Sequence, residues 1–444
     1  MEELDLSLSI LNDIIDNDVP FSEALRKVFK ADVEKRPLRG TVAALVGCEL
    51  RHHILFNYLL GDFEDFTDSE KRYTALALSN IAFVKKIETD AVKIALSQYV
   101  GDEKFAKLSE LLEKAETKQF IPETMSKTSN HYLALRYNTP EWVLKIWQHY
   151  GFGTTYKILR KNATPSFATL RVCHPLSVED LIARGPDFVA TSVDGIVSYR
   201  GKVAVRKLPE FQKGELFAEK PAIKVLVDRF KIEDPKELMV YEGDGDISLL
   251  LELLETYQDT IGMNFCVPNL DDYLPVTKAI RRKNLRNVNL FAAAPDSLEA
   301  GIARPLDLVI ASPKSTDFDR IREEPDYLLH FHKQEGEGQL YIQEKEVLEN
   351  ASRYVAENGT LVYMVRTISR KEGHNLINAF LANHPEFHLL EEKQMFPFEP
   401  AETALYYAAM VKRAELATEG VPLAPLLTDP NVSNAQSSAA KSAE

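Results

Sequence analysis

Short apolar segments alternate with helical patterns through the last part of this chain, from about Glu219 to Arg413. Strand-type runs such as MVYEG, TIGMNFCV and LDLVIASP are separated by helix-type runs such as ISLLLELLETY. This alternation is typical of a mainly parallel sheet that helices cover on both faces and that binds ligands at the carboxyl ends of its strands. Two closing runs, FHLLEEKQMF and ALYYAAMVKR, add two expected strands. We therefore predict an α/β domain over residues 219–413.

The first 125 residues have a different pattern, which is helical throughout. Leu8, Leu11 and Ile14 place apolar groups on one face of a helix. Thr67 and Glu70 have the spacing of a capping box, in which two residues satisfy the free N–H groups at a helix start. We predict an all-α domain over residues 1–125.

Between these two parts, residues 126–218 are expected to form a small connecting subdomain. KTSNHYLALRYNTPEW, at Lys127–Trp142, is a polar hinge that runs into an aromatic segment, and Pro140 suits the first turn of a helix. Apolar runs such as DFVATSV, GIVSYRG and KVAVRKL, separated by glycine and proline, indicate an α+β arrangement. At the other end, residues 414–444 are rich in proline, serine and alanine and are predicted to be disordered. The sequence thus favours a multidomain chain.

Composition limits the classes of function. The 444 residues carry a net charge of -14, which opposes general attraction to phosphates, so a nucleic-acid contact would need local basic patches. Cys48, Cys173 and Cys266 lie far apart, which indicates neither a disulfide framework nor a zinc site, and the histidines show no ligand pattern. No apolar run approaches the length of a membrane span, and the acidic start MEELDLSLSI is unlike a signal peptide. We expect a cytoplasmic protein with no membrane contact and no metal.

Several segments resemble one enzyme family. LALRYNTPEWVLKIW (Leu133–Trp147) and GTLVYMVRTIS (Gly359–Ser369) are similar to segments of the bacterial RsmB/Sun-type rRNA cytosine-5 methyltransferases. LVGCELRHHILFNYLL (Leu45–Leu60) looks like a helix of the NusB-like domain that precedes their catalytic part. The resemblance covers roughly Leu4 to Arg413. It implies an all-α NusB-like domain, an α+β linker and a Rossmann-like class I methyltransferase domain that uses S-adenosylmethionine.

The resemblance also locates the residues that would hold this cofactor. ELMVYEGDGDIS stands at the family's glycine-rich turn, where Met239, Asp246 and Ile247 replace its Asp, second Gly and Lys. The acidic residue that binds the ribose is missing from MNFCVPNL, which offers Asn264 and Asn269, and Asp271 would substitute if that strand ended late. These changes argue against tight cofactor binding. The candidate cofactor residues are Gly243, Asp244, Gly245, Asp246, Asp271 and Asp296.

The family's chemical positions lack their usual residues. Cytosine C5 becomes nucleophilic only after a cysteine thiolate has added to C6. Residue-by-residue matching puts Arg366 at that cysteine, Lys314 at the helper cysteine, and Ala311 or Ser312 at the catalytic Asp. Arginine stays protonated and cannot attack carbon. We therefore assign no catalytic residue, although Cys266, at the end of a predicted strand, is the one cysteine that could face the cleft.

Basic residues gather near the predicted cleft, where they would favour contact with the phosphates of RNA. Lys314 and Arg366 would make the mouth of the old active site more cationic. The candidate RNA-binding residues are Arg136, Lys157, Arg160, Lys161, Arg281, Arg282, Lys283, Arg286, Lys314 and Arg366.

Our leading hypothesis is an RNA- or ribosome-associated protein on an rRNA methyltransferase scaffold that lacks the cysteine-dependent chemistry. One alternative is an active S-adenosylmethionine-dependent RNA methyltransferase, in which ASPKS would position an exocyclic amine. Another is a protein-interaction module that uses the helical domain, with the sheet as its support.

Overall fold

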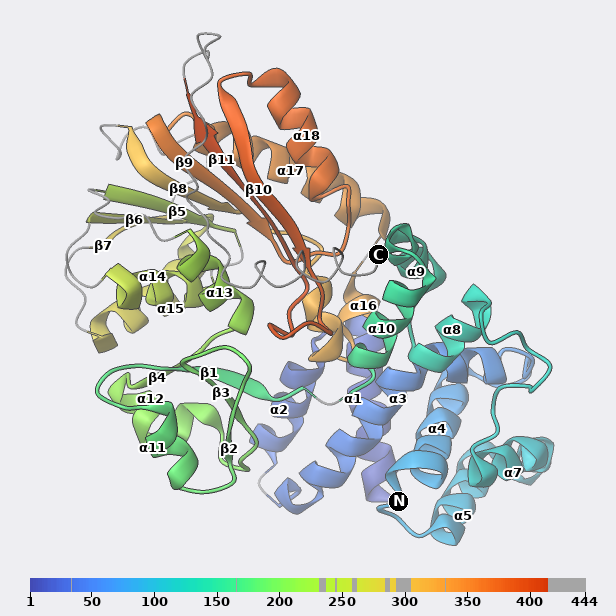
Figure 1. The fold of residues 1–444 in the computed structure, drawn as a ribbon. Coiled ribbons are helices and arrows are strands. Elements are labelled where there is room, and N and C mark those ends of the chain that lie inside the picture. Colours follow the sequence, from blue (N-terminus) through green and yellow to red (C-terminus); the bar gives the residue numbers. More distant parts are fainter. Residues whose placement is uncertain are drawn as a thin grey trace, which may run out of the picture.

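A computed structural model describes residues 1–32, 34–164, 166–230, 237–243, 246–257, 262–283, 288–292, 305–331 and 333–413. Figure 1 shows three parts: a group of helices, a small sheet and a large sheet with helices on both faces. The predicted disordered tail, residues 414–444, lies outside the described residues. None of the described helices is long and apolar enough to cross a membrane.

The first part of the chain is helical, as its apolar periodicity predicts. Leu8, Leu11 and Ile14 are buried in one core that the helices share. The predicted capping box is present, because the N–H of Thr67 donates to Glu70 Oε2 (2.7 Å) and the N–H of Glu70 donates to Thr67 Oγ1 (3.2 Å). The elements are α1 (Glu2–Asn17), α2 (Phe21–Ala31), η1 (Arg36–Leu38), α3 (Arg39–Leu60), α4 (Asp68–Ser79), η2 (Asn80–Val84), α5 (Thr89–Val100), α6 (Asp102–Lys107) and α7 (Ser109–Thr117).

Three helices connect this part to the large sheet: α8 (Asn130–Tyr137), α9 (Glu141–Trp147) and α10 (Phe152–Asn162), with the short turn η3 (Gln148–Tyr150). Pro140 directly precedes α9, where its fixed φ starts the helix at no cost in backbone bonds. Trp147 is fully buried against Phe318 and Ile368, which belong to the large sheet's loops. The aromatic segment therefore anchors the connecting helices to the α/β part.

The small sheet is antiparallel, with strand order β2-β3-β1-β4. Of the three apolar runs expected there, DFVATSV and GIVSYRG contain strands, whereas KVAVRKL forms a 3-10 turn. The elements are β1 (Ala168–Val172), α11 (Val178–Ala183), β2 (Phe188–Ala190), β3 (Ile196–Tyr199), η4 (Val205–Lys207), α12 (Pro209–Lys213) and β4 (Leu216–Ala218).

The large sheet has the strand order β10-β11-β9-β8-β5-β6-β7. Strands β5 to β9 run parallel, and β11 pairs antiparallel with both β9 and β10. The predicted α/β alternation is confirmed, and the closing pair of runs forms the two antiparallel strands. The strands are β5 (Glu237–Glu242), β6 (Gly262–Val267), β7 (Val288–Ala292), β8 (Leu306–Ser312), β9 (Val355–Val365), β10 (Phe387–Met395) and β11 (Leu405–Lys412).

Helices cover both faces of this sheet (Figure 1). Because side chains alternate along a strand, Leu238 and Val240 enter one core while Met239 and Tyr241 enter the other. The first core is closed by α13 (Pro221–Arg229), α14 (Ser248–Tyr257) and α15 (Leu270–Lys283), and the second by α17 (Lys333–Ser352) and α18 (His374–Asn383). The turn η7 (Phe318–Arg322) and α16 (Tyr327–His330) follow β8. The chain is thus a multidomain protein with a Rossmann-like sheet.

Candidate functional site

The carboxyl ends of β5, β8 and β9 bring the candidate residues together. These neighbouring strands end at Glu242, Ser312 and Val365, and Glu242 is in register with Ser312. The strand order reverses between β5 and β8, which is where open α/β sheets form their ligand crevice. Arg366, Lys314 and Asp246 all follow these strand ends, as the sequence predicts.

Gly243 allows the loops after β5 and β8 to approach closely. Its N–H donates to the Ser312 carbonyl (2.7 Å). A Cβ atom at this position would lie 2.3 Å from the backbone nitrogen of Lys314. The glycine is therefore required by a contact between two loops of the protein itself. The next two residues of the predicted cofactor turn, Asp244 and Gly245, lie outside the described residues.

Arg366 is held by two carboxylates. Its Nη1 lies 2.7 Å from Asp246 Oδ2 and its Nε lies 3.5 Å from Asp317 Oδ1. The side chain of Arg366 is only 14% exposed, so solvent screens these charges weakly. Arg366 therefore does not add a free positive charge to the crevice, and this part of the sequence interpretation needs correction. Lys314, by contrast, is exposed at the crevice mouth.

A buried carboxylate ties the two loops together beneath Arg366. Glu372 accepts bonds from the Thr316 N–H (2.9 Å), the Thr316 hydroxyl (2.7 Å) and the Thr367 hydroxyl. Tyr363 donates to the Glu372 carbonyl (2.8 Å). We call residues 313–317 and 366–372, with these bonds, the loop cluster. Its bonds fix the two loops in one arrangement.

Glu344, on α17, is a second buried acid beside the loop cluster. Burial and the neighbouring charge of Glu372 raise the pKa of Glu344 to about 10, and burial also raises the pKa of Glu372. The sequence interpretation missed both residues. Little in the sequence indicates that Glu344 is buried. It stands among other charged residues in the helix segment YIQEKEV, where the apolar Ile342 is exposed.

Asp271 and Asn264, two candidate substitutes for the family's ribose-binding acid, do not lie at the end of β6. Strand β6 ends at Val267, so Asp271 does not lie at a late strand end; it is exposed in the first turn of α15. Asn264 is buried within the sheet, where its amide donates to Glu237 Oε1 (2.8 Å). Asn269 caps the helix start by accepting a bond from the Asp271 N–H (2.9 Å). Asp296 lies outside the described residues.

The structure also describes the positions that match the family's catalytic Asp and the three cysteines. Ala311 and Ser312, the alternatives for the family's catalytic Asp, are both buried at the end of β8. Cys266 faces a hydrophobic core and is fully buried, which raises its pKa to about 12. Cys173 is buried too, and burial raises the pKa of Cys48, on the distant helix α3, to about 11. The surroundings of Cys48 and Cys266 thus disfavour the thiolate.

The predicted RNA-binding residues differ in how much charge they leave available. Lys161 is ion-paired with Glu402 (2.9 Å), which leaves less of its charge available to a ligand, and Lys157 lies over the ring of Phe398 at 5.5 Å. Others are exposed: Arg136 on α8, Arg160 on α10 and Arg281 on α15. The side chains of Arg282 and Lys283, and all of Arg286, lie outside the described part of the chain. Within that part, no group of histidine, cysteine and acidic residues has the arrangement of a metal site.

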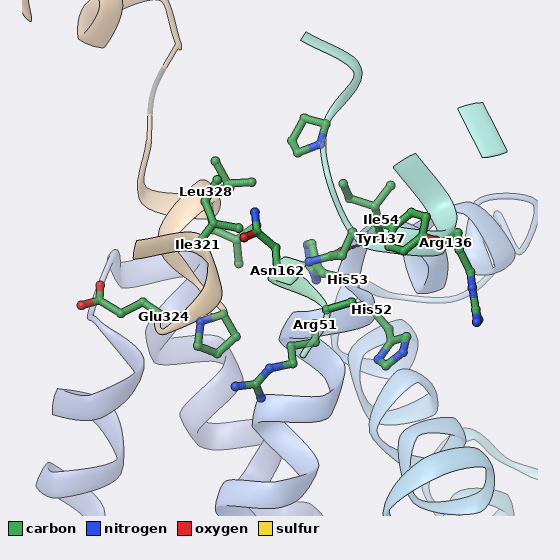
Figure 2. A pocket seen from close by; sticks show the side chains of 15 residues that line it. Arg51, His52, His53, Ile54, Arg136, Tyr137, Asn162, Ile321, Glu324 and Leu328 are labelled. Atoms are coloured by element: carbon green, nitrogen blue, oxygen red, sulfur yellow. Dashed lines mark hydrogen bonds between the residues drawn. The ribbon is translucent and has the colours of Figure 1, made fainter. Parts of the chain in front are cut away.

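A pocket of about 170 Å³ lies where α3, α8, α10 and α16 meet. Figure 2 shows Asn162 of α10 near its centre, close to Arg51 and His53 of α3, with Leu328 on another wall. Arg136 lies at the margin of the same pocket (Figure 2). The fold thus places a predicted residue in the lining of the same pocket as Arg51, a cation that the sequence did not single out.

Comparison with known proteins agrees with this architecture. No family model matches the chain. The "Probable ribosomal RNA small subunit methyltransferase B" of Bacillus subtilis (strain 168) is 24% identical over 409 residues, which cover 86% of this chain and 89% of that protein. The crystal structure of PH0851 superposes with a TM-score of 0.72 at 17% identity over 93% of this chain and 98% of that chain. The crystal structure of NSun6 from Pyrococcus horikoshii with SFG has a TM-score of 0.51 at 12% identity over 62% of this chain and 99% of that chain. The chain is thus similar over nearly its whole length to a protein of the RsmB-type rRNA methyltransferases, and it shares its fold with the two solved structures.

Proposed function

We propose that this protein binds RNA on an rRNA methyltransferase scaffold and does not carry out cysteine-dependent methylation of cytosine C5. The observation that carries the proposal is the 2.7 Å ion pair between Arg366 and Asp246. By resemblance, Arg366 stands where the family has its nucleophile and Asp246 stands in its cofactor turn. This ion pair therefore links the position of the nucleophile to the cofactor turn. The family's reaction needs these two positions apart, because the target base and the methyl donor must fit between them.

The chemistry of the residues supports the absence of this reaction. Addition to C6 requires a soft nucleophile with an ionisable proton, and a guanidinium has neither property. Lys314 is exposed at the helper position but is a cation at neutral pH, and neither Ala311 nor Ser312 can exchange a proton in that range.

The residues around the crevice also fit S-adenosylmethionine poorly. Room beside Gly243 is taken by the backbone of Lys314, and Asp246 is engaged by Arg366. The exposed Asp271 lies beyond the end of β6, in the first turn of α15, so it is a weak substitute for an acid at the strand end. We propose that cofactor binding is weak or absent.

RNA as the ligand is supported by the similarity to the ribosomal RNA methyltransferase of Bacillus subtilis and by the exposed cations Arg136, Arg160 and Lys314. Because the whole chain carries a charge of -14, RNA binding would have to use such local groups and would weaken steeply with salt.

Two titrations test the proposal. Calorimetry with S-adenosylmethionine is expected to give no micromolar binding, while a fluorescent rRNA fragment is expected to bind and to dissociate as salt increases. Micromolar cofactor binding would contradict the proposal in favour of an active methyltransferase, including one that acts on an exocyclic amine. Absence of both interactions would contradict it in favour of a protein-interaction module.

A further inference from the structure

An open hollow on the helical part of the protein is lined almost entirely by cations. It lies between α2, η1 and the start of α3, far in sequence from the crevice. We call it the basic hollow. Its lining residues are Arg26, Phe29, Lys30, Arg36 and Arg39.

The charges of the basic hollow are mostly not neutralised by the protein. Arg26 has one distant partner, Glu23, at 3.7 Å, and both side chains are more than half exposed. Among the described residues, no carboxylate lies within ion-pair distance of Lys30, Arg36 or Arg39, although all three are exposed. The nearby Asp32 is paired with Lys35 at 3.2 Å. These exposed cations therefore keep a locally positive surface on a protein whose net charge is -14, and such a surface attracts anions.

The hollow rests on a rigid base and extends beyond its lining. Phe29 is buried in the helical core, which fixes α2, and η1 leads directly into α3. Lys86 donates to the Gly40 carbonyl (2.7 Å), so a fifth cation lies beside the first turn of α3. The backbone that carries these cations is thus already ordered before a ligand arrives.

We propose that the basic hollow binds the phosphate backbone of RNA. The inference rests on the proposed RNA binding and locates it on the helical part, away from the crevice. Arginine and lysine bind phosphate through charge-assisted bonds, and four cations along three consecutive elements suit consecutive phosphates better than one small anion. No amide or carboxylate lines the hollow to read a base edge. We expect the contacts here to go mainly to phosphates and to depend little on base sequence.

Removal of three charges from the full-length protein tests this. In the variant Lys30→Gln/Arg36→Gln/Arg39→Gln, we expect RNA affinity to fall at least about tenfold at moderate salt, since three phosphate contacts are lost. The slope of log affinity against log salt should become less steep by about two to three. The loss should be similar for RNAs of different sequence.

The matched control removes three exposed cations from the small sheet, in Lys202→Gln/Arg206→Gln/Lys207→Gln, and so makes the same change in net charge. This control should keep nearly all of the affinity and the slope. Unchanged binding by the first variant, or an equal loss in the control, would overturn the inference while leaving the proposed RNA binding intact. If the wild-type chain bound no RNA, the proposed function itself would fail. Circular dichroism and thermal melting of both variants would identify a loss that came from unfolding.

Discussion

The loop cluster and the basic hollow deal with charge in opposite ways. In the loop cluster, Arg366 is held by two carboxylates and Glu372 by three donors, all with little exposure to solvent. In the basic hollow, Lys30, Arg36 and Arg39 are exposed and have no acidic partner among the described residues. Charges that are satisfied internally stabilise one arrangement, whereas exposed unpaired charges are available to a ligand. The difference suggests that binding has its best surface away from the crevice where the family has its chemistry.

The largest effect should come from removing the carboxylate at the centre of the loop cluster. Glu372→Ala leaves the Thr316 N–H and two hydroxyls buried without their acceptor. We expect a loss of about 3 kcal/mol in the free energy of unfolding, measured by urea denaturation. Glu346→Ala, an exposed acid on α17, is the control and should change stability little. Equal stability of the two variants would mean that the loops are not closed by Glu372.

A neutral replacement of Glu344 should stabilise the protein in a pH-dependent way. Its pKa is raised from an ordinary value of 4.5 to about 10 by burial and by Glu372. The acid is therefore protonated in the folded chain, and its contribution to stability is present below pH 4.5 and declines as the pH rises toward 10. Glu344→Gln removes this decline. We expect a gain of roughly 2 kcal/mol at pH 8 that vanishes near pH 4, measured by denaturation at both values. A gain that does not depend on pH would show that Glu344 is not neutral when folded.

His330 lies in the segment that follows residues 313–317 of the loop cluster, and it contacts Asp18 of the helical part. Its replacement therefore tests how firmly the loop cluster is connected to the helical part. Its ring contacts Asp326 (3.0 Å) and Asp18 (2.5 Å), and the bond to Asp326, opposed by burial and supported by Asp18, raises its pKa to about 9. Because the folded pKa is above the usual 6.5, the stabilisation is complete below pH 6.5 and is lost as the pH rises through 9. We expect His330→Gln to cost about 1 kcal/mol at pH 6 and almost nothing at pH 10. Thermal melting across this range measures the effect, and a constant difference would contradict it.

The sequence predicted local features well and long-range pairings poorly. The alternation of short apolar runs with helical patterns predicted the alternating strands and helices of the α/β part. The spacing of Thr67 and Glu70 predicted a helix cap. Both signals depend on residues that are neighbours in the sequence. The partners of Arg366 could not be predicted in this way. Asp246 lies 120 residues away in the sequence, and Asp317 follows β8, whereas Arg366 follows the neighbouring strand β9. Arg36 and Arg39 were overlooked because they do not stand in a basic run of the sequence. Only the fold brings them next to the cations of α2.

The smallest expected effect is the most informative one for the chemistry of the crevice. Restoring the family's cysteines in Arg366→Cys/Lys314→Cys should produce neither methyl transfer nor an adduct with RNA that contains 5-fluorocytosine. A thiol at position 366 would lie beside Asp246 and Asp317, whose negative charges raise a thiol pKa and leave little thiolate at neutral pH. The family's catalytic Asp would also still be absent, because Ala311 and Ser312 are unchanged.

Adding Asp246→Gly to the double variant removes one of the two charges and restores the family's residue in the cofactor turn. Labelled-methyl transfer and gel-shifted adducts would be measured for both variants. Activity in the double variant would show that the missing thiols alone silence the crevice, whereas activity only after Asp246→Gly would identify the ion-paired carboxylate as the second barrier.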